Sequence, residues 1–499
     1  MNNSSRHKFQ GLIALSHYIR QKGWIQLLVS GGLCLFFLLF LKTGIMVASA
    51  FALVPFILLS IYLFIYYIEN CFYIILLSQF FLLIASSYAD LPLGILSLLF
   101  SLLNILLLAF HHLYKSYNWK NSFNAMFYIF LLWSVYCILE ITNPNHIQEA
   151  WNISIMHYAF YPLLCALLLP LAVNNMQKVH WLFIIWGIFI LLAAFKGFYQ
   201  KEFGFNSREM YALYVLGKAR THIIWSGTRY FSFFTDAANY GVHMAMGAIT
   251  FVIASFYVKN IKLKCFYVLI SLAAIYGMGI SGTRAAIAIP LGGLGLLMIL
   301  SGKVKSFIIT LLAILSLFFF FKFTYIGNGN EYIRKMRSAF NPTEDASYLV
   351  RVSNRENMKE LMASKPFGYG IGLGGKAERF NPRELMPYPP DSWLINVWTD
   401  TGIIGLILYL ATHGVLFAWC SWILLFRIRN SQLKGLLTAW LCCNAGFFLS
   451  AYVNDVMQYP NSIIVYTGFA LCFAGVHIDK SLAKAEAGEE NQEEKSDAV

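Results

Sequence analysis

The chain has 499 residues, of which 59% are hydrophobic and only 12% are charged. Soluble globular domains carry about twice that share of charged residues, so the composition excludes the soluble classes and indicates a polytopic membrane protein. The formal net charge of +13 is spread over many loops along the chain.

Apolar runs long enough to cross a bilayer recur along almost the whole chain. A span needs about 20 predominantly apolar residues, and the pattern predicts an all-α bundle of about 12–14 transmembrane helices. The weakest candidates, 156–173 and 265–300, are also compatible with merged or re-entrant helices. The candidate spans are 25–41, 44–66, 71–87, 92–114, 122–141, 156–173, 179–200, 237–258, 265–281, 285–300, 306–322, 401–426, 435–452 and 461–478.

Lys and Arg are unevenly divided between the short loops on the two sides of these spans. The side that includes the N-terminus holds nearly all of them, whereas the short loops of the other side hold only Lys42 and Arg284. Because short cytoplasmic loops are enriched in Lys and Arg, we expect both termini in the cytoplasm and the long loops 201–235 and 323–390 outside. Basic outer loops then face away from the cytoplasm, and no nucleic acid is expected as a partner. The predicted inner cations include Lys115, Lys178, Lys259, Lys262, Lys264, Lys303, Lys305, Arg427, Arg429, Lys434 and Lys480.

The spans and long loops divide the chain into six predicted segments. The last is rich in Ala, Glu and Lys, and we expect a disordered cytoplasmic tail there. The predicted segments are spans in 1–200, an external loop at 201–235, spans in 236–322, a large external loop at 323–390, spans in 391–478 and the tail at 479–499.

The loop 323–390 is unusually basic for a segment between membrane helices, with ten Lys and Arg against seven Asp and Glu. Charges near lipid are costly, so a membrane protein that keeps this many beside its spans is expected to handle an anion. Acidic residues after Thr343 are typical of a helix start. We expect a helix to about Ala363 that lies over the spans as a lid. The apolar stripe predicted for it is Leu349, Val352, Met358, Leu361 and Met362.

A Gly-rich run, Gly368–Gly375, follows this helix. It comes after no predicted strand and lacks the βαβ context of a dinucleotide-binding fingerprint. We therefore expect a tight backbone turn that returns the loop to the membrane, and no cofactor.

Six short motifs follow one another within about residues 225–410. They are Arg229–Gly241 (RYFSFFTDAANYG), Ser281–Ala286 (SGTRAA), Ser347–Arg351 (SYLVR), Lys365–Gly374 (KPFGYGIGLG), Asp391–Leu394 (DSWL) and Asp400–Leu406 (DTGIIGL). Each motif is loose by itself, but their order, spacing and outward placement resemble those of the O-antigen ligase/polymerase family. The remaining spans resemble the family only as generic helices.

The resemblance implies a GT-C-like membrane glycosyltransferase of polysaccharide or lipopolysaccharide synthesis. Such an enzyme takes a glycan from undecaprenyl diphosphate on the periplasmic face of the bacterial inner membrane and transfers it to an acceptor glycan or lipid A core. A polymerase of the same family is the close rival of a ligase. A transporter or flippase of lipid-linked glycan is the alternative from another class, and it is expected to carry charges deep within its spans. The spans here are nearly free of them.

Four arginines are candidates for binding the diphosphate. Arg284 and Arg351, within matched motifs, are the predicted catalytic cations, and Arg229 and Arg355 are predicted to bind substrate. The planar fork of Arg matches phosphate oxygens bidentately, and fixed cations stabilise the charge that develops on a leaving group. The alternatives are a snorkelling interfacial residue for Arg284 and solvated loop charges for the others.

Asp391 marks a departure from the family pattern. Ligases of the family carry a His in this polar pair, and no His occurs anywhere in 323–390. A carboxylate is also able to accept the proton of the acceptor hydroxyl, so Asp391 is the predicted general base. A turn-forming Asp after two prolines is the alternative, and the departure leaves ligase and polymerase open.

Three further residues have a structural and a functional interpretation. Asp236 and Asn239 lie at the start of a predicted span, where they either cap the helix or contact substrate. Trp393 belongs either to an interfacial aromatic belt or to a platform for stacking sugars. With no outward Asp-x-Asp pair or His cluster, no metal ion is expected.

Overall fold

A computed structural model describes residues 68–89, 93–224, 227–340, 346–374 and 386–497. The predicted spans 25–41 and 44–66 lie outside these residues. Within them the protein is all-α apart from one two-stranded hairpin, and eleven helices are long and apolar enough to cross a membrane. The predicted fold class is confirmed.

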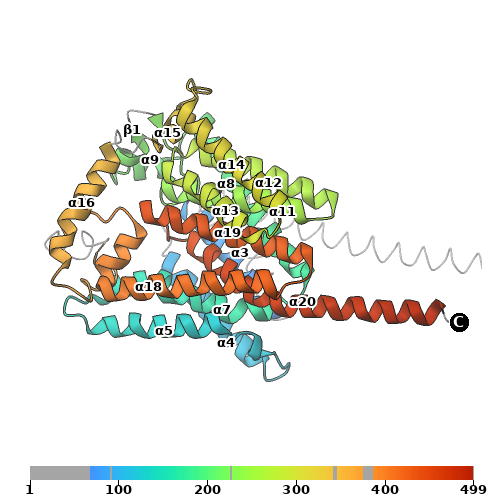
Figure 1. Cartoon of the computed structure of the whole chain (residues 1–499). Coiled ribbons are helices and arrows are strands. Elements are labelled where there is room, and N and C mark those ends of the chain that lie inside the picture. Colours follow the sequence, from blue (N-terminus) through green and yellow to red (C-terminus); the bar gives the residue numbers. More distant parts are fainter. Residues whose placement is uncertain (1–67, 90–92, 225–226, 341–345, 375–385, 498–499) are drawn as a thin grey trace, which may run out of the picture. The chain divides into compact units, whose positions relative to one another are not determined.

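The elements follow one another as a series of long helices interrupted by two groups of short ones (Figure 1). They are η1 (Ile68–Asn70), α3 (Cys71–Ser86), α4 (Leu93–His111), η2 (Trp119–Asn121), α5 (Ala125–Leu139), η3 (Glu140–Thr142), α6 (Gln148–Ile155), the π-helical η4 (Met156–Phe160), α7 (Tyr161–Ala172), α8 (Met176–Phe203), α9 (Ser207–Tyr214), α10 (Ala219–His222), β1 (Ile223–Ile224), β2 (Gly227–Thr228), α11 (Ala237–Tyr257), α12 (Ile261–Ile280), η5 (Arg284–Ile287), α13 (Ala288–Leu300), α14 (Val304–Phe323), α15 (Glu331–Ser338), α16 (Ala346–Met362), α18 (Trp393–Phe426), α19 (Ser431–Val453) and α20 (Asn461–Asp497).

The centre of the bundle is formed by α11 and α19, which pack against each other and against α12 and α13. Small residues permit this close approach. A side chain at Gly446 of α19 would overlap the backbone of Ile289 in α13, and one at Gly241 of α11 would overlap Ser281. By contrast, only Thr310 and Phe321 of α14 are buried, and the helix is predominantly apolar, as expected for a helix that faces lipid.

The predicted spans 265–281 and 285–300 are separate helices. The first, α12, ends at Ile280, and Gly282 then adopts a left-handed backbone conformation with φ 58° before η5 begins at Arg284. The span predicted at 156–173 is longer than expected, because α6, η4 and α7 form one continuous helical run over Gln148–Ala172.

The short elements of the two long loops gather at one end of the long helices (Figure 1). The β1–β2 hairpin and α9 come from the first loop, and α15 and α16 from the second. The predicted loop helix is present as α16. Its buried contacts come from Met358 and Met362, whereas Leu349 and Val352 of the predicted stripe are exposed.

The Gly-rich run folds back on a kink in α18. Gly368, Gly370 and Gly372 all have positive φ, as does Gly402 at the kink. The carboxylate of Asp400 accepts hydrogen bonds from the backbone N–H groups of Gly372 and Gly374, at 2.9 and 2.7 Å, and from the Tyr158 hydroxyl. Only glycine adopts such angles cheaply and leaves room for so close an approach, so the run is a turn docked on α18.

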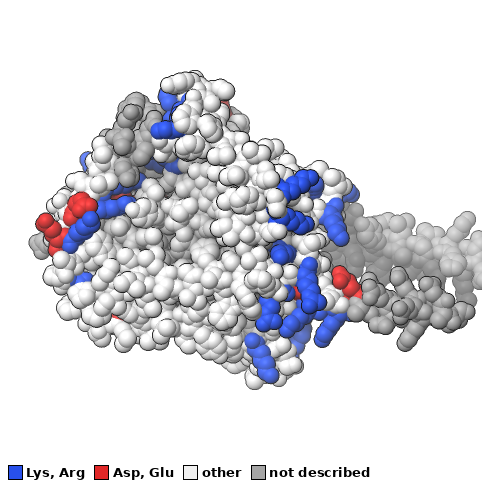
Figure 2. Space-filling view, in the orientation of Figure 1, with Lys and Arg blue, Asp and Glu red and all other residues white. Residues whose placement is uncertain are grey.

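Basic residues gather at the end of the bundle from which α20 projects (Figure 2). A mixed group of basic and acidic residues covers α16 at the other end. The tail predicted as disordered differs in the structure, because α20 continues to Asp497. The Ala, Glu and Lys of this segment are strong helix formers, and this preference extends the helix beyond its packed part.

Candidate active site

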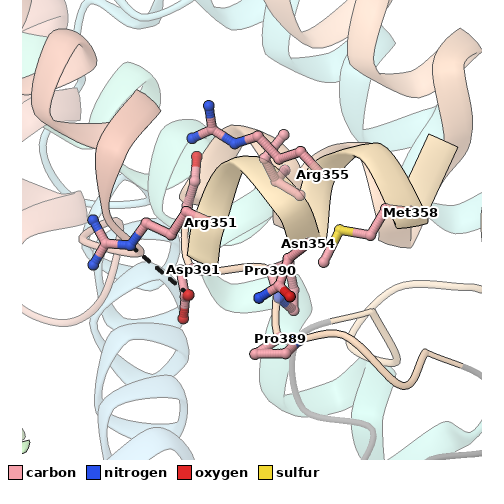
Figure 3. A pocket seen from close by; sticks show the side chains of 9 residues that line it. Arg351, Asn354, Arg355, Met358, Pro389, Pro390 and Asp391 are labelled. Atoms are coloured by element: carbon pink, nitrogen blue, oxygen red, sulfur yellow. Dashed lines mark ion pairs between the residues drawn. The ribbon is translucent and has the colours of Figure 1, made fainter. Parts of the chain in front are cut away.

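A small pocket lies between α16 and the start of α18, at the end of the bundle that carries the loop elements (Figure 3). Arg351 and Arg355 leave the same side of α16, since they are one helical turn apart. The segment before α18 contributes the opposite wall. The lining residues are Arg351, Asn354, Arg355, Met358, Pro389, Pro390, Asp391, Ser392 and Ile395.

Arg351 and Asp391 form an ion pair across this pocket. The Arg351 Nε lies 3.8 Å from the Asp391 Oδ2, and their side chains are 27% and 42% exposed. The same guanidinium donates from Nη1 to the carbonyl oxygen of Val453, at the end of α19. Arg351 therefore joins the loop helix α16 to the bundle. Some of its N–H groups remain at the pocket.

Arg355 is held by Tyr452 rather than by a carboxylate. Its guanidinium carbon lies 4.8 Å from the centre of the Tyr452 ring, and it donates to the Tyr452 hydroxyl and carbonyl oxygens. These contacts fix α16 against the end of α19. The positive charge of Arg355 still acts on the pocket it lines.

Burial and two nearby arginines act in opposite directions on the pKa of Asp391. Burial raises the pKa of this carboxyl above its ordinary value, although the positive charges of Arg351 and Arg355 act in the opposite direction. The sequence alone left open which effect is larger, and in the structure the net shift of the pKa is upward. A carboxyl with a raised pKa is a better proton acceptor when it is ionised.

Arg229 lies beside the turn that joins α12 to η5. Its guanidinium donates to the carbonyl oxygens of Ser281 and Thr221 and to the Thr283 hydroxyl, at 3.1–3.3 Å. Burial lowers the pKa of Arg229, the negative charge of Asp236 opposes this effect, and the positive charges of Arg284 and Arg351 add to it. The three family-matched arginines are thus close enough for their charges to interact.

Arg284 begins η5 on the other side of the same turn. Its Nη1 donates to the Ser338 hydroxyl at the end of α15. Distant parts of the chain therefore bring Arg229, Arg284 and Arg351 to one end of the bundle.

Lys335 is a candidate that the sequence motifs do not mark. It lies on α15, three residues before Ser338, and its side chain is only 8% exposed. A side chain built on Gly282 would come 3.3 Å from the Lys335 Cδ and 3.4 Å from the Arg229 Cγ. Both side chains therefore rest against the same glycine of the α12–η5 turn. In the sequence, Lys335 is one of several basic residues in a basic helix, so only its burial distinguishes it.

Asp236 and Asn239 have structural contacts. The Asp236 carboxylate caps α11, accepting from the backbone N–H groups of Ala238 and Asn239 and from the Asn239 side-chain amide. The Asn239 oxygen in turn accepts from Asn461, whose own oxygen pairs with His243. Asp236 is therefore the N-cap of α11. Asn239 is fully buried in a polar network between α11 and α20.

Trp393 is buried, so it is not part of an exposed aromatic belt. Its indole N–H donates to the Tyr409 hydroxyl at 2.8 Å, and its ring lies 5.0 Å from that of Tyr158. It also lines a second small pocket. That pocket is lined by Ser154, His157, Tyr158, Gly372, Trp393, Asn396, Asp400, Asp455, Met457 and Gln458.

No group of three or more His, Cys, Asp or Glu side chains in the described part of the chain is arranged to hold a metal ion. The eight described cysteines are free, and all but Cys265 are buried. The site thus consists of fixed cations and one partly buried carboxyl.

These features define a polytopic all-α membrane protein whose spans carry, at one end, a basic site roofed by a loop helix. Residues 266–410 match the family model described as O-antigen ligase. This region contains Arg284, Lys335, Arg351 and Asp391, and the match supports the resemblance to the O-antigen ligase/polymerase family that the motifs predict. The search of curated proteins found no match.

Proposed function

We propose that the protein transfers a glycan from undecaprenyl diphosphate to an acceptor sugar on the periplasmic face of the bacterial inner membrane. The observation that carries this proposal is the gathering of Arg229, Arg284 and Arg351 at one end of the bundle, within electrostatic reach of one another. Like charges repel, so a cluster of this kind is stabilised when it binds a multiply charged anion.

The diphosphate of the donor is an anion of this kind. In the transfer, the acceptor hydroxyl oxygen forms a bond to the anomeric carbon while the bond from that carbon to the diphosphate oxygen breaks. The diphosphate leaves with the electron pair, and the arginines stabilise its developing charge. Because guanidinium groups supply this stabilisation, we propose a transfer that needs no metal ion.

Asp391 is the proposed proton acceptor. It lies opposite Arg351 in the pocket beneath α16, where its raised pKa suits it to take the proton of the acceptor hydroxyl. Its ion pair with Arg351 couples the base to the cations that face the donor.

The proposed orientation places both termini in the cytoplasm and α16 in the periplasm. Basic residues gather at the end of the bundle from which α20 projects (Figure 2), and such a gathering is typical of a cytoplasmic face. The site lies at the opposite end, where a lipid-linked glycan on the outer leaflet would meet it.

The test is transfer by the purified protein in proteoliposomes that contain lipid-linked donors and lipid A core from the source bacterium. A ligase produces glycan attached to the lipid A core, whereas a polymerase produces a ladder of longer lipid-linked glycans. Movement of the lipid-linked glycan between leaflets without any new glycosidic bond would instead identify a flippase and overturn the proposal.

A further inference from the structure

Lys335 carries a buried ammonium group that lies 5.5 Å from the centre of the Tyr332 ring and lacks a hydrogen-bond acceptor. Its Nζ is inaccessible to solvent and makes no hydrogen bond in the structure. The nearest carboxylate oxygen is Glu331 Oε1, at 3.9 Å, beyond hydrogen-bond distance. Burial of a charged group without hydrogen bonds is costly, so such a group in a folded protein implies a partner that is bound only part of the time.

The position of this ammonium is well determined by the fold. Asn330 caps α15, and Met336 packs with Ile287 and Phe321 in an apolar cluster beneath the helix. The α15 helix therefore cannot rotate to release Lys335 into solvent without exposing this cluster. The ammonium is held at the α12–η5 turn.

Two other cations meet at the same turn. Arg229 packs on Gly282 beside Lys335, and Arg284 contacts Ser338 one turn along α15. The charge of Arg229 lowers the pKa of Lys335, in addition to the larger effect of burial. Three cations thus lie at the α12–η5 turn, and Glu331 is the carboxylate paired with Lys335 there.

We propose that Lys335 is a further cation of the site that includes Arg229 and Arg284 and that its ammonium binds a phosphate oxygen of the donor diphosphate. This inference rests on the proposed function. The planar guanidinium groups of the two arginines would bind phosphate oxygens bidentately, whereas Lys335 supplies a compact charge with three N–H donors. The anion would provide the hydrogen bonds that the buried ammonium lacks.

Binding of undecaprenyl diphosphate to the full-length protein in nanodiscs tests this inference. Lys335→Gln should raise the Kd about tenfold, the usual effect of losing one hydrogen bond to a charged group. Arg334→Gln is the matched control, because it removes the same charge from the neighbouring, exposed position of α15. It should change the Kd less than twofold.

Glu331→Gln separates anion binding from a purely structural role. If Lys335 binds the diphosphate, removing the competing carboxylate should leave the Kd unchanged or lower it. If Lys335 serves only to pair with Glu331, both variants should lower the thermal stability alike and neither should change the Kd. That result would overturn the inference.

The inference and the proposed function fail in different ways. If Arg284→Ala weakens binding of undecaprenyl diphosphate but Lys335→Gln does not, the inference is wrong and the proposed function stands. If the unmodified protein binds inorganic pyrophosphate but not undecaprenyl diphosphate, the proposed lipid donor is wrong. In that case, tighter binding of pyrophosphate by the unmodified protein than by Lys335→Gln would still support Lys335 as an anion ligand.

Discussion

The Nε of Arg351 on the loop helix lies 3.8 Å from a carboxylate oxygen of Asp391, in the segment that precedes α18. The two residues are forty positions apart in the sequence, and each belongs to a different motif of the family pattern. Their pairing brings the proposed base and a proposed diphosphate ligand into one pocket. A change at either residue should therefore affect the other.

The arginines should be essential for transfer. Arg284→Ala and Arg351→Ala should each reduce the rate at least about 10²-fold, because each removes a fixed cation that stabilises the leaving group. Lys at either position should restore activity only in part, since a point charge lacks the bidentate geometry of Arg. Rates are to be measured with protein whose membrane insertion has been verified. Near-normal rates in both Ala variants would show that these arginines are solvated charges.

Asp391→Asn should slow transfer by roughly 10²–10⁴-fold, because it nearly preserves the shape of the side chain and removes its basicity. Asp391→His should retain some activity if this position corresponds to that of the family histidine. Steady-state rates with a purified lipid-linked donor check both expectations. If the Asn variant transfers normally, Asp391 is a turn residue.

The pH dependence of transfer should reflect the raised pKa of Asp391. A base acts only when ionised, so the rate should fall on acidification through the pKa of Asp391, which lies above the ordinary range of Asp. Arg355 lowers this pKa through its charge. Arg355→Gln should therefore move the acidic limb of the rate profile to higher pH. An unchanged acidic limb would argue against Asp391 as the titrating group.

Transfer should persist in the presence of a chelator. The proposed mechanism relies on guanidinium groups to neutralise the diphosphate, so EDTA should leave the rate within about twofold of its untreated value. Loss of activity with EDTA and recovery with added Mg²⁺ or Mn²⁺ would show that a metal ion assists the leaving group.

Single cysteines labelled with a membrane-impermeant maleimide check the proposed orientation. Arg220→Cys and Lys359→Cys, at exposed positions of the two long loops, should react in cells whose inner membrane is intact and accessible from the periplasm. Lys262→Cys, at the start of α12, should react only after the membrane is permeabilised. The opposite pattern would place the basic site in the cytoplasm and contradict the proposed donor.

Much of the fold follows from local sequence. The apolar run of α14 (Val304–Phe323) is long enough to cross a bilayer by itself, and it meets few protein neighbours, so its composition alone determines it. The loop helix α16 was predictable from the acidic residues that precede it in the sequence and from Pro366, which no helix easily passes. The arginines were chosen as candidates because they lie in motifs whose order and spacing are visible in the sequence, and their roles stay predictions.

Only the tertiary structure shows which groups each of these side chains contacts. The sequence shows a Gly-rich run but not that Asp400 binds its backbone, because that contact depends on how α18 bends at Gly402. In the sequence, Asp236 is equally compatible with a helix cap and with a substrate contact. Its capping hydrogen bonds become visible only in the structure of α11. Lys335 differs in its burial from Lys359 and Lys365, the other lysines of the loop that the structure describes, and burial is a property of long-range packing. Charge and hydropathy are local and can be read from the chain, whereas the surroundings of a charge arise when distant segments meet.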